Sequence, residues 1–225
     1  MSVREPQGMP RGRLLPSAVL LDFHNTLAIA RSVEDWIGGA RSMVSGGIGA
    51  PERLPEMIRN VWGDARELFP ALEWDLDPAA HRHAFVSTLG RGDGVSSEFA
   101  EALYETMPRQ WVLNAGAAAF IVRASAAGIL LGLVSNIALD VRPALEGWGI
   151  ASAFGAVILS YEVGYAKPDP RIFQLAADSL GVDPTACLMI GDSAHDDGGA
   201  SALGMQCMIT RPEQMRHVFE LVCPP

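Results

Sequence analysis

Residues 18–27 read AVLLDFHNTL, an apolar run that ends in the carboxylate of Asp22 and continues as a polar turn. Three later apolar runs also end in polar side chains. They are residues 129–134 before Ser135 and Asn136, 156–159 before Ser160 and, soon after, Lys167, and 187–190 before Gly191 and Asp192. In an open parallel sheet, ligands bind beyond the carboxyl ends of the strands. The pattern therefore predicts one shared site at a sheet rim and favours an enzyme.

The second half of the chain alternates short apolar runs with helical patterns. We expect strands at 18–21, 129–134, 156–159, 187–190 and 206–209, and helices at 116–127, 140–147, 168–180, 197–203 and 212–222. Alternating strands and helices are typical of βαβ units with a parallel sheet. The predicted fold class is α/β, a doubly wound, Rossmann-like core with a five-stranded parallel sheet.

The segment between the first two strands has a different character. It lacks strand-like runs, its apolar residues recur at helical spacing, and it carries most of the tryptophans. We expect residues 31–111 to form an inserted α-helical cap domain between two parts of the core, residues 17–30 and 112–225. Residues 1–16 are expected to be a flexible arm.

Composition excludes several classes of protein. The 225 residues carry a net charge of −9, which argues against a nucleic-acid partner because phosphate backbones attract basic faces. No run approaches the roughly 18 apolar residues of a membrane helix. The three cysteines cannot all pair within the chain and lack metal-ligand spacing, which fits a reducing, cytoplasmic location. The oligomeric state cannot be read from the sequence.

Each motif has a functional and a structural interpretation. Asp22 is costly to bury unless it is paired, so it is a candidate nucleophile, metal ligand or both, or else a helix cap. Ser135 and Asn136 can hold phosphate oxygens at a helix entry, or act as N-caps. Lys167 precedes a proline, hence an extended backbone that aims its ammonium group at one place, although surface lysines are common.

The last motif places three carboxylates within six residues, at Asp192, Asp196 and Asp197. Without a cation they would repel one another, and Mg²⁺ prefers oxygen ligands of this kind. The alternative is a solvated acidic turn.

In this order, the four motifs resemble those of the haloacid dehalogenase-like (HAD) superfamily of hydrolases, over residues 17–30 and 112–222. The insertion resembles the helical C1-type cap of that superfamily, which closes over the site and selects the substrate. The resemblance implies that Asp22 attacks phosphorus and forms an aspartyl-phosphate. It also implies that Ser135, with Asn136 beside it, binds the phosphoryl oxygens and that Lys167 neutralises Asp22 and the phosphoryl group.

The same resemblance implies Mg²⁺ as cofactor and a small phosphorylated metabolite as substrate. Asp22, the backbone carbonyl of His24 and Asp192 would bind the ion. The second acid of the last motif aligns with Asp196, which would lie outside the direct ligands, and Asp197 is the alternative.

His24 departs from the phosphatase pattern, in which the residue two after the nucleophile is usually a second Asp. That Asp protonates the leaving oxygen and later activates water. An imidazole, with an ordinary pKa of about 6.5, can do both, so His24 is a candidate general acid/base; otherwise it only packs.

The departure leaves other functions open. Dehalogenases of the superfamily lack the second Asp, but they also lack the Gly-Asp motif present here. Phosphonate-cleaving relatives use a cap lysine, and residues 31–110 contain none. A catalytically silent binding or regulatory protein is the remaining alternative.

Some cap residues are candidates for contacting the substrate: Arg53, Arg59, Arg66, His81, His83 and the tryptophans. Arginine suits phosphate or carboxylate groups, and tryptophan suits a ring or a sugar face. The alternative is that the tryptophans form the cap core and the arginines lie on the solvated surface.

Overall fold

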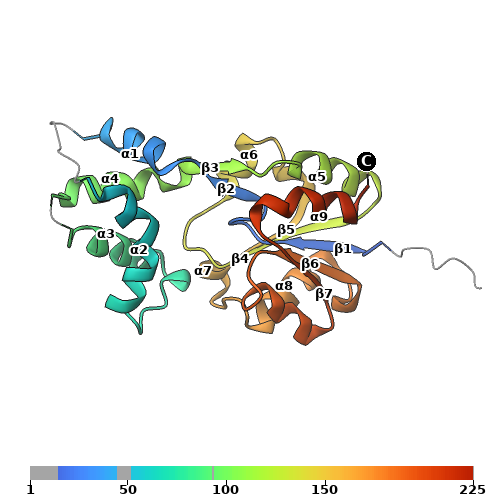
Figure 1. Cartoon of the computed structure of the whole chain (residues 1–225). Helices are drawn as coiled ribbons and strands as arrows, with labels where there is room; N and C mark the ends of the chain where they lie inside the picture. The colour runs from blue at the N-terminus through green and yellow to red at the C-terminus, as the bar shows by residue number, and fades with distance from the viewer. Residues whose placement is uncertain (1–14, 45–51, 93, 225) are drawn as a thin grey trace, which may run out of the picture.

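The computed structural model describes residues 15–44, 52–92 and 94–224. Nearly all of the predicted N-terminal arm, residues 1–14, lies outside this part. Figure 1 shows two bodies side by side, a helical one containing α1–α4 and a larger one containing the sheet and its flanking helices. The strands are β1 (Ala18–Leu21), β2 (Ala28–Ala30), β3 (Trp111–Leu113), β4 (Leu130–Ser135), β5 (Phe154–Leu159), β6 (Cys187–Gly191) and β7 (Gln206–Ile209).

The helices are of two kinds. The α-helices are α1 (Val33–Arg41), α2 (Leu54–Leu68), α3 (Pro78–Leu89), α4 (Ser97–Thr106), α5 (Ala117–Ala126), α6 (Arg142–Gly147), α7 (Ser160–Val163), α8 (Pro170–Leu180) and α9 (Met215–Val222). The 3-10 helices are η1 (Trp74–Leu76), η2 (Met107–Gln110), η3 (Ala151–Ala153), η4 (Pro184–Ala186), η5 (Asp197–Leu203) and η6 (Pro212–Gln214).

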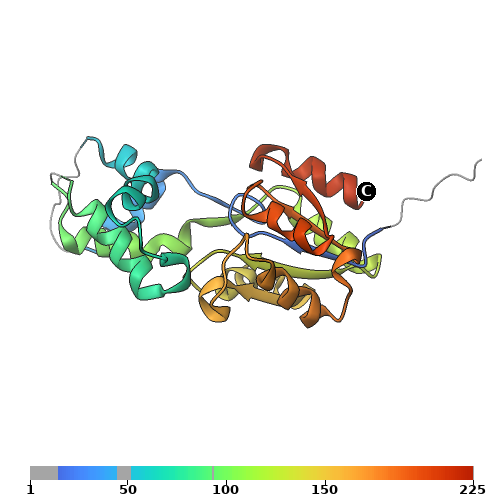
Figure 2. The same cartoon turned by 90° about the horizontal axis from the view of Figure 1, so that it is seen from below.

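The main sheet confirms the predicted fold class. Its strand order is β5-β4-β1-β6-β7, and every neighbouring pair is parallel. Alternate side chains of the central strand β1 reach opposite faces: Val19 and Leu21 pack in the cluster that contains α5 and α9, and Leu20 packs in the cluster with α8. Helices therefore cover both faces, as Figure 2 shows, and the central strands β1 and β6 are buried throughout, as expected for a parallel sheet.

Most element boundaries lie within two residues of the predicted ones, but the last predicted helix, 212–222, divides into η6 and α9, so the α-helix begins at Met215. Helix α8 begins at Pro170 instead of residue 168, because the Asp169 side chain caps it by accepting the backbone N–H of Arg171 at 2.9 Å. The proline at its first position fits, since that position has no hydrogen-bond partner for an N–H. Strand β5 begins at Phe154, two residues before the predicted start.

The helical body has a hydrophobic cluster of its own, built from α1–α4 around Phe85, Phe99 and Leu103. This separate core supports the proposed division into a cap (31–111) and a core (17–30 and 112–225). Two connections join them in an antiparallel ribbon of β2 and β3, which the sequence did not predict. Each strand has only three residues, too short for an alternating pattern to stand out.

One hydrogen bond ties the cap to the core away from the ribbon. The Ser160 hydroxyl, at the start of α7, donates to the backbone carbonyl of Asp75 in η1 at 2.6 Å. In Figure 1, α7 lies on the side of the core that faces the cap. This bond holds η1 over the carboxyl ends of the strands.

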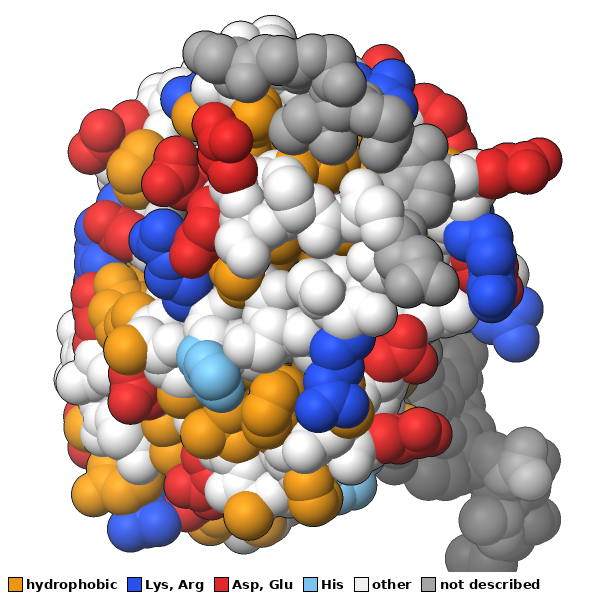
Figure 3. Space-filling model, turned by 90° about the vertical axis from the view of Figure 1, so that its left-hand side faces the viewer, with side chains coloured by type: hydrophobic (Ala, Val, Ile, Leu, Met, Phe, Trp, Pro, Cys, Tyr) orange, Lys and Arg blue, Asp and Glu red, His pale blue; other side chains and the backbone are white. Residues whose placement is uncertain are grey.

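The end of the cap farthest from the core faces the viewer in Figure 3. On that face, Lys and Arg side chains are interspersed with Asp and Glu. Within the described ranges, no helix combines the length and the apolar character that a membrane crossing requires.

Candidate active site

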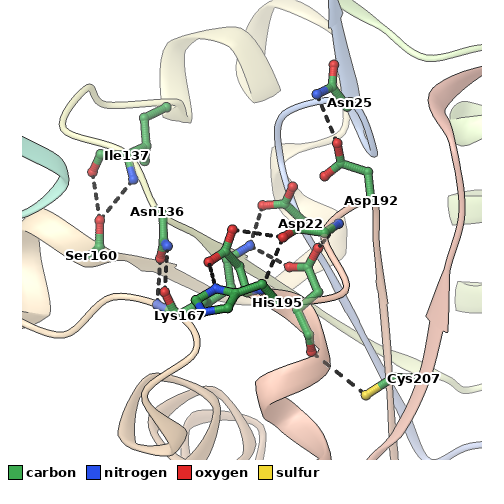
Figure 4. A network of polar contacts seen from close by, with 12 residues as sticks. Asp22, Asn25, Asn136, Ile137, Ser160, Lys167, Asp192, His195 and Cys207 are labelled. Carbon is green, nitrogen blue, oxygen red and sulfur yellow. Dashed lines mark hydrogen bonds and ion pairs between the residues drawn. The ribbon is translucent and has the colours of Figure 1, made fainter. Parts of the chain in front are cut away.

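The predicted site residues meet where the strands end. Asp22 follows β1, Asp192 follows β6, and Asp197 begins η5. Lys167 lies in the loop between α7 and α8. Because β1 lies between β4 and β6, these carboxyl ends are neighbours, and Figure 4 shows Asp22, Lys167 and Asp192 converging. The shared rim expected from the sequence is present.

Lys167 forms ion pairs with two carboxylates of the site. Its Nζ lies 2.6 Å from Asp22 Oδ1 and 2.7 Å from Asp197 Oδ1. The lysine side chain is only 3% exposed, and it is the only lysine in the sequence. Burial on this scale is costly for an ammonium group unless carboxylates pair with it. The interpretation of Lys167 as a surface lysine is therefore wrong.

Asn136 holds Lys167 in place. Its Oδ1 accepts the Lys167 backbone N–H at 2.6 Å, and its Nδ2 donates to the Lys167 carbonyl at 2.9 Å. Asn136 was predicted to lie beside Ser135 at the phosphoryl oxygens, and this role stays a prediction. Asn136 lines the cavity described below, and its side chain holds the backbone of Lys167 through two hydrogen bonds.

Ser135, at the end of β4, is buried, and among the described residues its hydroxyl has no hydrogen-bond partner. An unpaired buried hydroxyl costs free energy, but Ser135 is not among the residues that line the cavity described below, so its contact with a phosphoryl oxygen stays a prediction. Ser160, the other strand-end serine, is already engaged. Its hydroxyl accepts the N–H of Ile137 at 2.9 Å and donates to Asp75 of the cap.

Three carboxylates each offer an oxygen within 4.8 Å of the others: Asp22, Asp192 and Asp197. The sequence favoured Asp196 as the second acid of this motif, and the structure places Asp197 in the group instead. Asp197 is fully buried, and its Oδ2 accepts the Ser193 backbone N–H at 3.0 Å. Asp196 also lines the cavity described below, where it accepts a hydrogen bond from Ser193 Oγ and pairs with the exposed His195.

Asn25 is a site residue to which the sequence analysis assigned no role. Its backbone has φ of +58°, a left-handed conformation that Asn tolerates better than most residues. That turn directs its Nδ2 to Asp192 Oδ2 at 2.9 Å (Figure 4). In the sequence, only the position of this asparagine, shortly after the Asp22 carboxylate and before the next strand, could have indicated a role in the site.

Burial and pairing shift the pKa values of these groups. Burial raises the pKa of Asp22 to about 6, against the opposing effect of Lys167. Burial disfavours the Lys167 ammonium, but Asp22 and Asp197 outweigh that effect, so the lysine pKa is raised. Burial also raises the pKa of Asp192, while its bond from Asn25 acts the other way.

His24 lines the cavity beside Asp22 with its ring open to the space. The ring packs edge-to-face on Phe23 and Trp111, with centroids 5.2 and 5.7 Å apart. Desolvation by the surrounding walls and the charge of Lys167 lower the pKa of His24 to about 4. At neutral pH the imidazole is therefore neutral, so the expected pKa near 6.5 does not hold here.

A cavity of about 730 Å³ separates the cap from the core and contains this site. The core wall includes Asp22, Lys167 and Asp192. The cap wall comes from the end of α2, the following loop and η1, and includes Arg66 and Asp75. The volume is that of a small-molecule site.

The pattern characteristic of haloacid dehalogenase-like hydrolases matches residues 16–204. The chain belongs to this family. The family predicted from the four motifs is thereby confirmed.

Among curated relatives, phosphoserine phosphatase of Thermus thermophilus is 38% identical over 113 residues, which are 49% of this chain and 45% of the relative. The chain spans about half the length of the curated relatives it matches. Among solved structures, L-2-haloacid dehalogenase of Xanthobacter autotrophicus aligns with a TM-score of 0.66 at 25% identity, over 87% of this chain and 78% of that one.

A HAD family enzyme of Bacteroides thetaiotaomicron, an Asp-to-Ala mutant in complex with magnesium and inorganic phosphate, aligns with a TM-score of 0.55 at 19% identity. The alignment covers 87% of this chain and 94% of that one. At this identity the similarity shows a shared fold.

The acidic group suits a hard divalent cation. Asp22, Asp192 and Asp197 supply carboxylate oxygens, the ligand type that Mg²⁺ prefers, and they converge from three separate segments. Burial is the largest cause of the raised pKa of both Asp22 and Asp192. The residues present therefore fit the metal that the HAD-like family implies.

Of the cap residues predicted to contact substrate, Arg66 and Trp74 line the cavity. Arg53 and Arg59 form exposed ion pairs elsewhere, with Glu56 and Glu34. Most of the remaining candidates pack within the cap: His81 bonds Tyr104 and packs on Trp62, His83 contacts Ser87 and Phe69, and Trp36 packs on Phe85. Trp111 packs on Phe23 in the core. For these residues the structure agrees with the alternative interpretation, in which the arginines lie on the surface and the aromatic residues pack.

Proposed function

We propose that this HAD-like hydrolase is a Mg²⁺-dependent phosphatase that cleaves a small phosphomonoester through an aspartyl-phosphate on Asp22. The observation that carries the proposal is the buried Lys167 bridging Asp22 and Asp197, with Asp192 beside them. A carboxylate, an ammonium group and a divalent-cation site within one small volume are what phosphoryl transfer needs, because its catalysis is mostly positioning and charge stabilisation.

The first step makes one bond and breaks another. An oxygen of Asp22 bonds to phosphorus as the ester P–O bond breaks, while Lys167 stabilises the phosphoryl oxygens and the buried Ser135 hydroxyl donates to one of them. Mg²⁺, held by Asp22, Asp192 and the His24 carbonyl with Asp197 close by, would draw negative charge from the transferring group. The leaving oxygen takes a proton from the imidazolium form of His24.

The second step returns the enzyme to its starting state. A water oxygen bonds to phosphorus as the bond between phosphorus and the Asp22 oxygen breaks, and the neutral ring of His24 accepts a proton from that water. Asp22 is freed as a carboxylate, and inorganic phosphate leaves. Neutral His24 is the major form at neutral pH, so it suits this step better than the first. Weakly basic leaving groups, such as aryl oxides, are therefore expected to depart faster than alkoxides.

The relatives support the proposal at a general level. One curated relative is named a phosphoserine phosphatase, and one structural neighbour was solved with magnesium and inorganic phosphate. A reducing compartment such as the cytoplasm would keep the three cysteines free, as they are here, and we place the enzyme there.

A dehalogenase function is the second candidate, favoured by the structural similarity to L-2-haloacid dehalogenase and by the missing second Asp. The triple-carboxylate group counts against it, because attack on a haloacid carbon needs no divalent cation. Release of halide from 2-chloropropionate, unaffected by chelator, would support the dehalogenase. A silent regulatory protein would release neither halide nor phosphate.

The decisive experiment measures hydrolysis of p-nitrophenyl phosphate with and without Mg²⁺. Replacing Asp22 by Asn should lower turnover by roughly 10⁴-fold or more, since a nucleophile is lost. Asp64→Asn, the same change at an exposed position on α2, is the matched control and should leave turnover unchanged. Turnover that is independent of Mg²⁺, or that survives in Asp22→Asn, would contradict the proposal.

A further inference from the structure

The cap wall of the cavity carries a carboxylate that the proposed reaction does not use. Asp75, in η1, lines the cavity and is partly buried. Among the described residues, no hydrogen bond or ion pair engages its carboxylate. Burial raises its pKa, and the opposing influence of Arg66 is incomplete. Asp75 therefore brings a carboxylate without a described partner to the wall of a cavity that a ligand can enter.

The position of Asp75 is fixed by the core. Its backbone carbonyl accepts the Ser160 hydroxyl at 2.6 Å, and that hydroxyl also accepts the Ile137 N–H at 2.9 Å. Asp75 is thus tied to the loop that follows β4. The reacting groups follow neighbouring strands, and both Lys167 and Asp196 influence its pKa. Asp75 and Lys167 line the same cavity, one on the cap wall and the other on the core wall, so a substrate whose phosphoryl group contacts Lys167 can place its alcohol part against Asp75.

Arg66 lies on the same wall but apart from Asp75. Its guanidinium stands over the Trp74 ring, 5.5 Å from the centroid, and no ion pair within 4.0 Å joins it to Asp75. The cap wall thus offers one negative and one positive group to the same cavity, each with room for a ligand group.

The charge of the cavity favours a cationic substrate group. Its lining contains six carboxylates and two cations, Lys167 and Arg66, a net of −4. A divalent metal would leave −2, and a phosphate monoester dianion then adds to the negative charge. The six carboxylates are Asp22, Glu73, Asp75, Asp192, Asp196 and Asp197.

We propose that Asp75 is a specificity-determining residue that pairs with a protonated amine on the alcohol part of the substrate. The substrate class is then the phosphomonoesters of amino alcohols and amino acids, and Arg66 receives the carboxylate where the substrate has one. The inference rests on the proposed phosphatase function and names its substrate class.

Three nearly isosteric esters test the inference: phosphoethanolamine, 2-hydroxyethyl phosphate and 2-phosphoglycolate, which end in a cation, a neutral group and an anion. The protein should show a kcat/KM for phosphoethanolamine roughly 10- to 100-fold above that for 2-hydroxyethyl phosphate, the usual worth of a charged hydrogen bond. Phosphoglycolate should be the poorest of the three. Phosphoserine should equal or exceed phosphoethanolamine, and Arg66→Gln should remove that advantage.

Asp75→Asn should abolish the preference for the amine, so that kcat/KM for phosphoethanolamine falls to the value for 2-hydroxyethyl phosphate in the same variant. The asparagine keeps the backbone carbonyl that Ser160 bonds, so η1 should stay in place. Asp64→Asn removes the same charge from an exposed part of the cap and should keep the preference. A structural defect would instead lower the rate for every ester alike.

Equal rates for the amine and hydroxyl esters, or a preference that survives in Asp75→Asn, would overturn the inference while leaving the phosphatase proposal intact. Hydrolysis of p-nitrophenyl phosphate with no turnover of any amine ester would overturn it as well. If no ester is hydrolysed, the phosphatase proposal fails. Calorimetry of ester binding then tests whether Asp75 recognises the amine. Tighter binding of phosphoethanolamine than of 2-hydroxyethyl phosphate, lost in Asp75→Asn, supports the inference, and equal or absent binding overturns it.

Discussion

On the core wall of the cavity the charged side chains contact one another, whereas on the cap wall they stand apart. Lys167 touches both Asp22 and Asp197, and all three are buried. Arg66 and Asp75 line the same cavity without an ion pair between them among the described residues. Fully buried charges must be paired to be tolerated, while charges at an open wall keep part of their hydration. The core is thus prearranged for chemistry, and the cap keeps groups available for recognition.

The largest expected effect concerns His24, which lies on the core wall. His24→Ala should slow turnover by roughly 10²- to 10⁴-fold, the usual range for general acid–base catalysis. His24→Asp, which restores a carboxyl group at this position, should recover part of the loss. The measurement is steady-state hydrolysis of p-nitrophenyl phosphate at saturating Mg²⁺.

Burst kinetics identify the step that His24 serves. A base acting on water makes hydrolysis of the aspartyl-phosphate slow, so His24→Ala should release one equivalent of p-nitrophenol rapidly and then stall. An unchanged rate in His24→Ala would assign the ring to packing against Phe23 and Trp111.

The next largest effect separates the two neighbouring acids of the last motif. Asp197→Asn should weaken Mg²⁺ affinity or activity by about 10- to 100-fold, the range for residues that orient a metal site. Asp196→Asn, one residue away with its side chain directed to Ser193 and His195, is the matched control and should change little. Mg²⁺ titration of activity and of intrinsic fluorescence measures both. A larger loss in Asp196→Asn would restore the original alignment of this motif.

A smaller effect concerns the stability of the cap at low pH. His81 is buried, and desolvation lowers its pKa to about 4, so the unfolded chain binds a proton more readily. Its contribution to stability is complete above pH 6.5 and is lost as the pH falls toward 4. At pH 5 the loss amounts to about 2 kcal/mol. Urea denaturation at pH 7 and pH 5 measures it.

His81→Gln should flatten this pH dependence, because glutamine does not titrate. The exposed His83, two residues further along α3, provides the control: His83→Gln should keep the wild-type slope. An identical slope in His81→Gln would mean that other groups govern the acid sensitivity.

The smallest effect concerns Asn25, which orients Asp192. Asn25→Ala removes the donor to Asp192 and places alanine at φ of +58°, so Mg²⁺ affinity should fall by about 10-fold. Asn25→Gly keeps the left-handed turn without the donor and isolates the hydrogen bond from backbone strain. If Asn25→Gly binds Mg²⁺ as the wild type does, the amide has no part in the site.

Sequence patterns identified the core wall well. Asp22, Lys167 and Asp192 follow strand-like runs, and the sheet topology brings such positions together whatever the details of packing. The same logic missed the choice between Asp196 and Asp197. One residue of difference in a tight 3-10 turn reverses the direction of a side chain, and no apolar periodicity marks it.

The cap wall was not predictable to the same degree. Arg66 was one of several candidate arginines, and Asp75 gave no signal at all. Whether either faces the cavity depends on how η1 rests on the core, through a hydrogen bond between Ser160 and Asp75 that links positions 85 residues apart.

The order of apolar runs and polar ends was sufficient to predict the α/β class and the inserted helical segment, because strand and helix periodicity are local properties of the chain. The motifs at the strand ends carried the resemblance to the family that residues 16–204 match. Tertiary structure alone decided that Asp197 joins the acidic group, that Asn136 positions Lys167, that the pKa of His24 is lowered, and that Asp75 faces the cavity. Each of these depends on contacts between distant segments and on the burial that they create, which local sequence does not encode.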